Sequence, residues 1–369
     1  MSTIKKIVLT GGPCAGKTTA RAYLMQKLGD LGYHVIFVPE APTLLLENGV
    51  KPGPGLLSKE SFQQIVLDLA LALEAGYGRA AAAMPKSAKP VIICDRGIMD
   101  GMAYVEGDGT RFISWLVERD LTRVTARDAR YHGIFHLRTA AVGAEAYYTL
   151  ANNPARFETP EQARSRDQCT QAVWMGHPHL RIIPNTGSFE QKLKHLLAEI
   201  CVLLGIPEPV ETERKFLVRP DFDPNDLTAH ALIDIEQFYL FSNALNEELR
   251  FRKRSQNGDA TYFSTVKRPG PDPASRIETE EFITAEQYEF GKQFMLSGSR
   301  FVRKQRYCFV YENQYFELDA VIEPKLKYCL LELELAEPGQ DIKLPPFLNI
   351  VREVTGEKEW SNFALATRP

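Results

Sequence analysis

A glycine-rich segment near the N-terminus has the residue types and spacing of a phosphate-binding loop. Residues 11–18 read Gly-Gly-Pro-Cys-Ala-Gly-Lys-Thr and fit GxxxxGK[ST] at every fixed position. Glycines let backbone amides turn toward phosphate oxygens, the lysine reaches the β- and γ-phosphates, and the threonine hydroxyl ligates Mg²⁺. The alternative, an accidental glycine-rich turn, is disfavoured because an apolar strand precedes the motif and a helix pattern follows. The predicted nucleotide-binding residues are Gly11, Gly12, Pro13, Cys14, Ala15, Gly16, Lys17, Thr18 and Thr19.

Two acids follow other apolar runs in the first half of the chain. Val91–Cys94 is an apolar run followed by Asp95, which is typical of a strand whose terminal carboxylate holds Mg²⁺ directly or through water. The alternative role for Asp95 is to cap the next turn. Glu40 ends another expected strand, where a carboxylate can accept a proton from an acceptor hydroxyl or simply face water. Arg96, next to Asp95, is expected to contact substrate or phosphate.

Three arginines lie in a polar stretch between the last two expected strands of this half. Such arginines can close over phosphates as a lid, although an exposed helix rich in ions is the alternative. The predicted catalytic residues of the first half are Glu40, Asp95, Arg96, Arg156, Arg164 and Arg166.

Charged residues alternate along the second half. Glu211, Glu213 and Lys215 share one face of a strand, and acidic or basic pairs recur on later strands with the two signs segregated. The simplest alternative is that these charges face water. If the strands instead close into a barrel, basic side chains in the lumen bind a polyphosphate. Carboxylates there favour Mg²⁺ or Mn²⁺.

The elements that must position these residues fall into two patterns. Residues 4 to about 207 alternate strand and helix, which predicts a largely parallel sheet covered by helices. Gly205–Pro209 breaks this pattern and predicts two domains, residues 1–207 and 208–369. The second domain is expected to be an antiparallel sheet or barrel. The strand-like runs there are Glu211–Val218, Phe238–Leu240, Glu248–Lys253, Thr261–Lys267, Arg276–Ile283, Arg303–Glu312, Gln314–Val321 and Cys329–Leu335.

The composition is that of a soluble globular protein. Hydrophobic residues make up 44%, charged residues 25%, and the net charge of −3 gives no sign of a nucleic-acid-binding coat. Six cysteines without CxxC spacing favour a reduced, cytoplasmic protein. No apolar run has transmembrane length, and the N-terminus does not resemble a signal peptide.

The first half resembles the NadR/Ttd-type AAA-like P-loop domain, which is similar to nucleoside and nucleotide kinases. The resemblance covers about residues 4–200 and implies that Glu40 and Asp95-Arg96 lie on the acceptor side and that the arginines form a lid. Besides the P-loop and Glu40, it is carried by Asp95–Gly97, Gly143–Glu145, Tyr148, Asn152-Asn153, Arg156, Glu158–Glu161 and Gly176–His179.

The second half, from about residue 208 to 360, is similar to the CYTH or triphosphate tunnel metalloenzyme superfamily. This resemblance implies an eight-stranded antiparallel tunnel. It is carried by ExExK at residues 211–215, Leu249–Arg252, Thr265–Lys267, Arg276–Glu280, Lys304–Arg306, Leu318-Asp319 and Glu332–Glu334. The metal carboxylates that it implies are Glu211, Glu213, Asp319, Glu332 and Glu334. The phosphate-binding residues that it implies are Lys215, Arg250, Arg252, Lys267, Lys304 and Arg306.

The pairing of both domains resembles the TRPL-translocation-defect family of GTP- and phosphoinositide-binding proteins. Two hypotheses follow. In one, the chain is an enzyme that binds ATP or GTP with Mg²⁺, hydrolyses it or transfers phosphate, and hydrolyses a triphosphate in the tunnel. In the other, it is a nucleotide-dependent switch whose tunnel binds a phosphorylated headgroup, with peripheral membrane contact.

Overall fold

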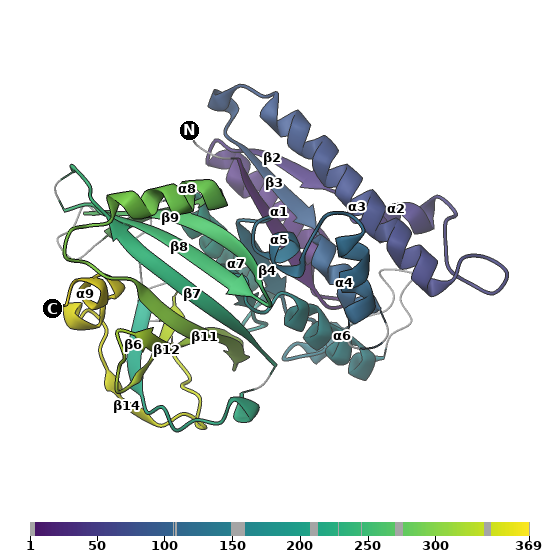
Figure 1. Cartoon of the computed structure of the whole chain (residues 1–369). Coiled ribbons are helices and arrows are strands. Elements are labelled where there is room, and N and C mark those ends of the chain that lie inside the picture. The colour runs from purple at the N-terminus through teal and green to yellow at the C-terminus, as the bar shows by residue number, and fades with distance from the viewer. Residues whose placement is uncertain are drawn as a thin grey trace. The chain divides into compact units, whose positions relative to one another are not determined.

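The computed structural model describes two compact units, Met1–Ala198 and Glu199–Pro369. The described residues are 4–105, 107, 109–148, 159–206, 213–227, 229–244, 246–269, 276–335 and 341–368. The predicted boundary between residues 207 and 208 stays a proposal. Figure 1 shows the N-terminal unit in purple to teal and the C-terminal unit in teal to yellow.

The N-terminal unit contains a five-stranded parallel sheet in the order β2-β3-β1-β4-β5. The central strands are buried on both faces, as in sheets covered by helices, and therefore appear in the sequence as continuous apolar runs. The predicted parallel sheet is confirmed. The strands are β1 (Lys5–Gly11), β2 (His34–Val38), β3 (Pro90–Asp95), β4 (Gly133–Leu137) and β5 (Leu180–Ile183).

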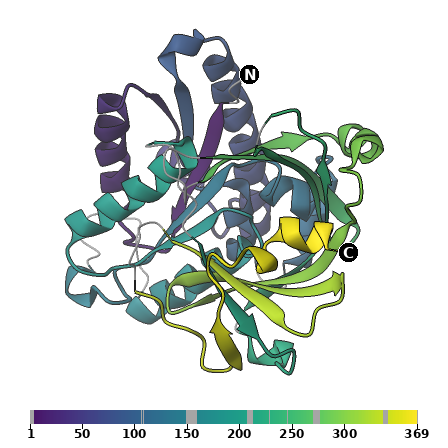
Figure 2. The ribbon, with the colours of Figure 1, turned by 90° about the vertical axis from the view of Figure 1, so that its left-hand side faces the viewer.

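Helices lie on both sides of this sheet (Figure 2). Side-chain caps fix where several of them start, among them α3 and α6. Ser58 accepts a hydrogen bond from the Ser61 amide at the start of α3, and Thr159 and Gln162 form a capping box at the start of α6. The helices are α1 (Lys17–Asp30), α2 (Ala41–Glu47), α3 (Lys59–Ala82), α4 (Thr110–Val117), α5 (Arg123–Arg127), α6 (Pro160–Val173) and α7 (Phe189–Leu204).

The C-terminal unit contains a nine-stranded antiparallel sheet in the order β10-β9-β8-β7-β11-β12-β13-β6-β14. The resemblance implied eight strands, and the additional one is β14, which pairs with β6 at the edge of the sheet. The strands are β6 (Glu213–Val218), β7 (His230–Leu240), β8 (Glu248–Gln256), β9 (Asp259–Pro269), β10 (Arg276–Ile283), β11 (Val302–Tyr311), β12 (Gln314–Glu323), β13 (Cys329–Glu334) and β14 (Ile350–Glu353). Helices α8 (Ala285–Gly291) and α9 (Asn362–Thr367) complete the unit.

One face of the large sheet packs into an apolar core, as predicted from the alternating pattern. Phe316, Leu318, Leu331, Leu333 and Leu335 are buried together there. Helix α8 covers part of this face, where its Tyr288 packs with Phe238 and Phe251. Around the Phe316 and Leu331 cluster, the apolar side chains packed against the sheet come from the non-helical segment that carries Ile342, Leu344 and Phe347, and from Phe222. The charged residues at alternate positions therefore lie on the opposite face.

Among the described residues, no helix has both the length and the apolar character needed to cross a membrane.

Candidate functional site

The backbone of the P-loop has a conformation that only glycine adopts easily. Gly11 has φ +141° and Gly16 has φ +87°. A Cβ on Gly11 would lie 2.1 Å from the carbonyl oxygen of Leu137, so close packing also requires glycine there. Helix α1 begins directly after Gly16, at Lys17. The loop therefore ends in the free amides of a helix N-terminus, which bind anions.

Lys17 lies half-buried at the start of α1, followed by the exposed Thr18 and Thr19. Burial lowers the pKa of Lys17, and so does Arg96, whereas Glu40 and Asp95 act in the opposite direction. Within the described residues the Lys17 ammonium makes no hydrogen bond or ion pair. This cation is therefore available to a phosphate.

Asp95 ends β3, and its neighbour across the sheet is Leu9 of the strand that leads into the P-loop. Its Oδ1 atom is buried and has no hydrogen-bond partner within the described residues. Burial raises the pKa of Asp95, while Lys17 lowers it. A buried carboxylate oxygen without a donor fits a hard cation, so Asp95 and the Thr18 hydroxyl are suited to hold Mg²⁺.

Glu40 and Arg96 form an ion pair beside the P-loop. Arg96 adopts φ +70° and also donates to the Gly11 carbonyl at 3.3 Å. Burial alone would raise the pKa of Glu40, but Arg96, Lys17 and a hydrogen bond from Thr43 lower it to about 2. Such a weak base suits a group that orients Arg96 better than a group that removes a proton.

The structure brings one of the predicted lid arginines next to Arg96. The guanidinium carbons of Arg96 and Arg166 lie 5.6 and 4.3 Å from the centre of the Tyr104 ring. Arg166 also donates to the Ala103 carbonyl. Arg164 instead donates to the Ala141 carbonyl at 3.0 Å. The third predicted arginine, Arg156, lies outside the described residues.

Two buried charged residues that support the P-loop were not predicted. The Asp167 carboxylate of α6 accepts from the Gly12 amide at 2.8 Å, although 155 positions separate them. The Lys192 ammonium of α7 donates to the Ala15 carbonyl at 3.0 Å and to the Arg138 carbonyl at 2.7 Å. In the sequence both residues look like ordinary charges of polar helices, so no local signal identifies them.

The predicted tunnel residues lie on one face of the large sheet. Residues directly opposite each other on antiparallel strands point to the same side, and a chain of such pairs crosses the sheet from β6 to β10. The pairs that link the predicted residues are Lys215–Glu332, Glu332–Glu317, Arg306–Asp319, Val302–Gln237, Gln237–Arg252, Arg250–Thr265 and Lys267–Glu278.

Arg306 of β11 is the centre of an ion-pair network on this face. Its guanidinium lies 2.6 Å from Asp319 and 2.9 Å from Glu332, and it also pairs with Glu317. Lys304 pairs with Asp319 as well. Lys215 of β6 lies 2.9 Å from both Glu213 and Glu332.

A second network links β8, β9 and β10. Lys267 lies 3.0 Å from Glu278, and Arg250 lies 3.5 Å from the same carboxylate. Arg252 lies 3.6 Å from Glu280. All six predicted phosphate-binding residues therefore belong to the two networks, each with carboxylates among its partners.

The carboxylates implied as metal ligands are arranged around basic side chains in the described part of the chain. No group of three or more histidine, cysteine, aspartate or glutamate side chains there is close enough to hold a metal ion. Asp319 and Glu332 face lysine and arginine instead. Glu334 lies directly opposite Glu213 in the β13–β6 ladder, and Glu211 lies outside the described residues. The described tunnel residues thus do not fit a metal cluster.

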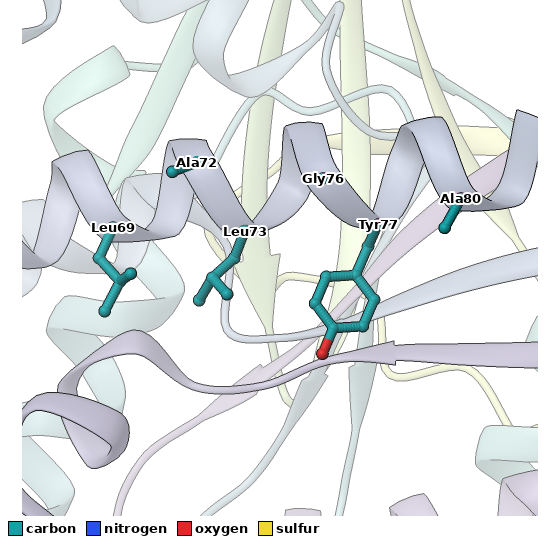
Figure 3. Close-up of a pocket in the computed structure, with 6 residues that line it drawn as sticks. All are labelled: Leu69, Ala72, Leu73, Gly76, Tyr77 and Ala80. Atoms are coloured by element: carbon teal, nitrogen blue, oxygen red, sulfur yellow. The ribbon is translucent and has the colours of Figure 1, made fainter. Parts of the chain in front are cut away.

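An apolar pocket along α3 has no group suited to phosphate. Figure 3 shows Leu69, Leu73 and Tyr77 extending from the same side of this helix. Its six lining residues are Leu69, Ala72, Leu73, Gly76, Tyr77 and Ala80.

Comparison with known proteins places the first half of the chain in a family. A family model described as AAA domain matches residues 6–192, which is about half of the chain. No curated protein matches. A solved structure titled as the inorganic triphosphatase NE1496 is 30% identical, with 43% of this chain and 95% of that chain covered and a TM-score of 0.32. The PH1819 protein from Pyrococcus horikoshii OT3 is 23% identical, with 35% and 80% covered and a TM-score of 0.27.

Proposed function

Because the chain belongs to the AAA domain family, we propose that residues 1–207 bind ATP or GTP and hydrolyse it or transfer its terminal phosphoryl group to a small acceptor. The observation that carries this proposal is the glycine-shaped loop that leads into α1, with the Lys17 ammonium unpaired among the described residues. Bound Mg²⁺ would supply charge neutralisation of the phosphates. Thr18 and Asp95 would hold it.

The residues around the P-loop have distinct roles in this proposal. Lys17 binds the β- and γ-phosphates, and the backbone amides of residues 15–19 cradle them. Arg96 faces the transferring phosphoryl group and is held in place by Glu40. Arg166, across the Tyr104 ring, adds a second guanidinium on the acceptor side. The six cysteines form no disulfide among the described residues, which supports a cytoplasmic protein.

For residues 208–369 we propose a tunnel that binds a triphosphate or another phosphorylated group. The supporting observation is the convergence of six buried or partly buried cations on one face of the sheet, which are Lys215, Arg250, Arg252, Lys267, Lys304 and Arg306. A polyphosphate would take over hydrogen bonds that the tunnel carboxylates now accept. In the enzymatic form of the proposal the tunnel hydrolyses the triphosphate with Mg²⁺ or Mn²⁺.

One observation favours a binding role without turnover in the tunnel. Its described carboxylates are paired with lysine and arginine and form no cluster suited to a metal. The second candidate function is therefore a nucleotide-dependent switch, whose tunnel binds a phosphorylated headgroup such as that of a phosphoinositide.

Phosphate release measured with purified protein separates these functions. Wild type, Lys17→Ala and the Glu332→Ala/Glu334→Ala double variant are each incubated with ATP, GTP or tripolyphosphate and Mg²⁺ or Mn²⁺. We expect Lys17→Ala to abolish nucleotide turnover in the first domain. If the double variant no longer releases phosphate from tripolyphosphate, the tunnel is a triphosphatase.

Other results would favour the switch or exclude the P-loop as the source of turnover. Absence of any turnover, together with tight binding to vesicles that contain phosphoinositides, establishes the switch. Nucleotide turnover that survives Lys17→Ala rules out the P-loop as its source.

A further inference from the structure

Gln237 lies between the two basic strands of the tunnel face. In the sheet, β7 runs between β8 and β11, and the three strands lie side by side in Figure 1. Gln237 of β7 is directly opposite Arg252 of β8 and Val302 of β11. Lys304, two residues after Val302, points to the same face. Arg252 therefore lies beside Gln237, and Lys304, opposite Ile235, is a diagonal neighbour of Gln237 on this face.

The side-chain amide of Gln237 is buried, and its N–H donor makes no hydrogen bond within the described residues. Its Oε1 accepts from Arg252 Nε at 3.3 Å, and this bond sets which end of the amide carries the donor. Its Nε2 is buried and has no hydrogen-bond partner within the described residues, and the whole residue is 0% exposed. An unsatisfied buried donor costs about 1–3 kcal/mol, so a group that accepts from Nε2 would recover this energy.

The arginines beside this amide favour an anionic ligand. Burial lowers the pKa of Arg252 to about 10, assisted by Arg250 and Arg306. Glu280, 3.6 Å from Arg252, acts in the opposite direction. Arginines outnumber carboxylates among the groups that act on Arg252, so an acceptor carrying negative charge fits beside Gln237 better than a neutral one.

We propose that Gln237 donates through Nε2 to a phosphoryl oxygen of the tunnel ligand, at a subsite between Arg252 and Lys304. The inference rests on the proposed function of the tunnel. It adds one uncharged hydrogen-bond donor to the basic residues that are proposed to bind the ligand. A phosphoryl group there would accept from Gln237 and from both of these cations at once. The chemistry required is a phosphoryl oxyanion, whether of a free polyphosphate or of a phosphorylated headgroup.

The test compares tripolyphosphate binding by titration calorimetry in the full-length Lys17→Ala protein with and without Gln237→Met. The Lys17→Ala background weakens binding at the P-loop, so that the titration reports the tunnel. Methionine keeps the length and volume of glutamine but removes the donor. We expect affinity to fall about 10-fold or more, as for loss of a hydrogen bond to a charged group.

Thermal unfolding without ligand distinguishes a binding role from a structural one. If Nε2 serves the ligand, Gln237→Met changes the melting temperature little, since loss of the unsatisfied buried donor offsets loss of the Oε1 that accepts from Arg252. If the amide only supports the fold, the melting temperature falls while the affinity of the folded protein is unchanged. The matched control is Gln305→Met. Gln305 lies on the neighbouring strand and points to the opposite face, where it donates to Asp234.

A second variant guards against failure of the first to fold. Gln237→Glu keeps an oxygen that can accept from Arg252 and replaces the Nε2 donor by a charged acceptor. We expect it to bind tripolyphosphate more weakly than Gln237→Met. Wild-type affinity in either variant overturns the role of Gln237 and leaves the tunnel proposal intact. Failure of the Lys17→Ala protein to bind either tripolyphosphate or phosphoinositide vesicles overturns the tunnel proposal itself.

Discussion

The Asp167 carboxylate accepts a hydrogen bond from the Gly12 amide at 2.8 Å and thereby joins helix α6 to the P-loop. The same carboxylate lies 3.1 Å from the Thr139 amide, 3.2 Å from His136 Nε2 and 2.9 Å from Arg138. Burial alone would raise the pKa of Asp167, but these partners lower it to about 2, so it stays ionised. Arg166 is its neighbour in the chain, so the contact also fixes where that guanidinium lies.

We expect Asp167→Asn to weaken nucleotide binding. The substituted amide keeps one oxygen for Gly12 but brings an N–H group toward Arg138, which disturbs the loop that must receive the phosphates. Loss of about 1.5–3 kcal/mol, as for a hydrogen bond to a charged group, corresponds to about 10- to 100-fold in affinity. Titration with a non-hydrolysable ATP or GTP analogue measures it. Asp68→Asn, which alters an exposed ion pair with Arg119, serves as the control.

The sequence predicted the nucleotide site where chemistry and backbone geometry are local. The P-loop, Asp95 and Glu40 each belong to a short segment, and the sheet order then brings those segments together at one edge. Asp167 and Lys192 were not predictable in this way. Their role depends on helices α6 and α7 folding back onto residues 12 and 15. A charged residue in a helix most often faces solvent, so its type alone does not indicate such a role.

In the second half, alternation predicted which residues share a face but not what they contact. The resemblance assigned Asp319 and Glu332 to a metal, whereas the described structure pairs them with Arg306. The first part of β7 was also missed, although Asp234 and Glu236 flank Ile235 there in the same alternation. Gln237 was missed since a single uncharged polar residue gives no pattern. Its significance comes from the strands on either side.

The Glu40–Arg96 pair predicts a pH dependence of stability. The pKa of Glu40 is about 2 in the folded protein against an ordinary value of 4.5, so the unfolded state binds more protons between these values. The stabilisation is therefore complete above pH 4.5 and is lost as the pH falls toward 2. Urea unfolding of wild type and Glu40→Gln should differ most above pH 5 and converge in acid. Glu47→Gln, in an exposed position, should show no such difference. If the difference in free energy of unfolding between wild type and Glu40→Gln stays constant down to pH 2.5, the lowered pKa of Glu40 is contradicted.

Arg306 is the shared cation of three tunnel carboxylates, and its removal should create a site for a metal cation. In Arg306→Met, the carboxylates of Glu317, Asp319 and Glu332 lose their shared cation, which should destabilise the protein by about 3–5 kcal/mol. We expect millimolar Mg²⁺ or Mn²⁺ to raise the melting temperature of this variant more than that of wild type.

Arg303→Met is the matched control for Arg306→Met. Arg303 lies on the same strand but pairs with the partly exposed Glu236 and Glu323, so its loss should cost no more than about 1 kcal/mol. Equal responses of both variants to the divalent ions would show that the tunnel carboxylates do not gather around Arg306.

From the lowered pKa of Lys304, we predict that tripolyphosphate binding weakens as the pH rises through about 8. Burial lowers the pKa of Lys304 to about 8, so the ammonium that attracts the anion is neutral above this pH. Stability should move in the opposite direction. The unfolded lysine titrates near 10.5, so the unfolded state binds more protons between pH 8 and 10.5, and the free energy of unfolding rises with pH across that window.

Calorimetric titrations of the Lys17→Ala protein from pH 6.5 to 9.5 measure the effect on binding, and Lys304→Arg is the informative comparison. Arginine remains charged throughout this range, so the affinity of this variant for tripolyphosphate should lose the fall near pH 8 and keep only the smaller fall toward pH 9.5 that Arg252 contributes. Lys215 should not contribute to the change. Burial lowers its pKa, but Glu332 and Glu213 raise it above the ordinary value, and the side chain stays protonated. If the affinity of Lys304→Arg falls along the same curve as that of the parent protein, the titrating group is not Lys304 and the subsite beside Gln237 loses one of its two cations.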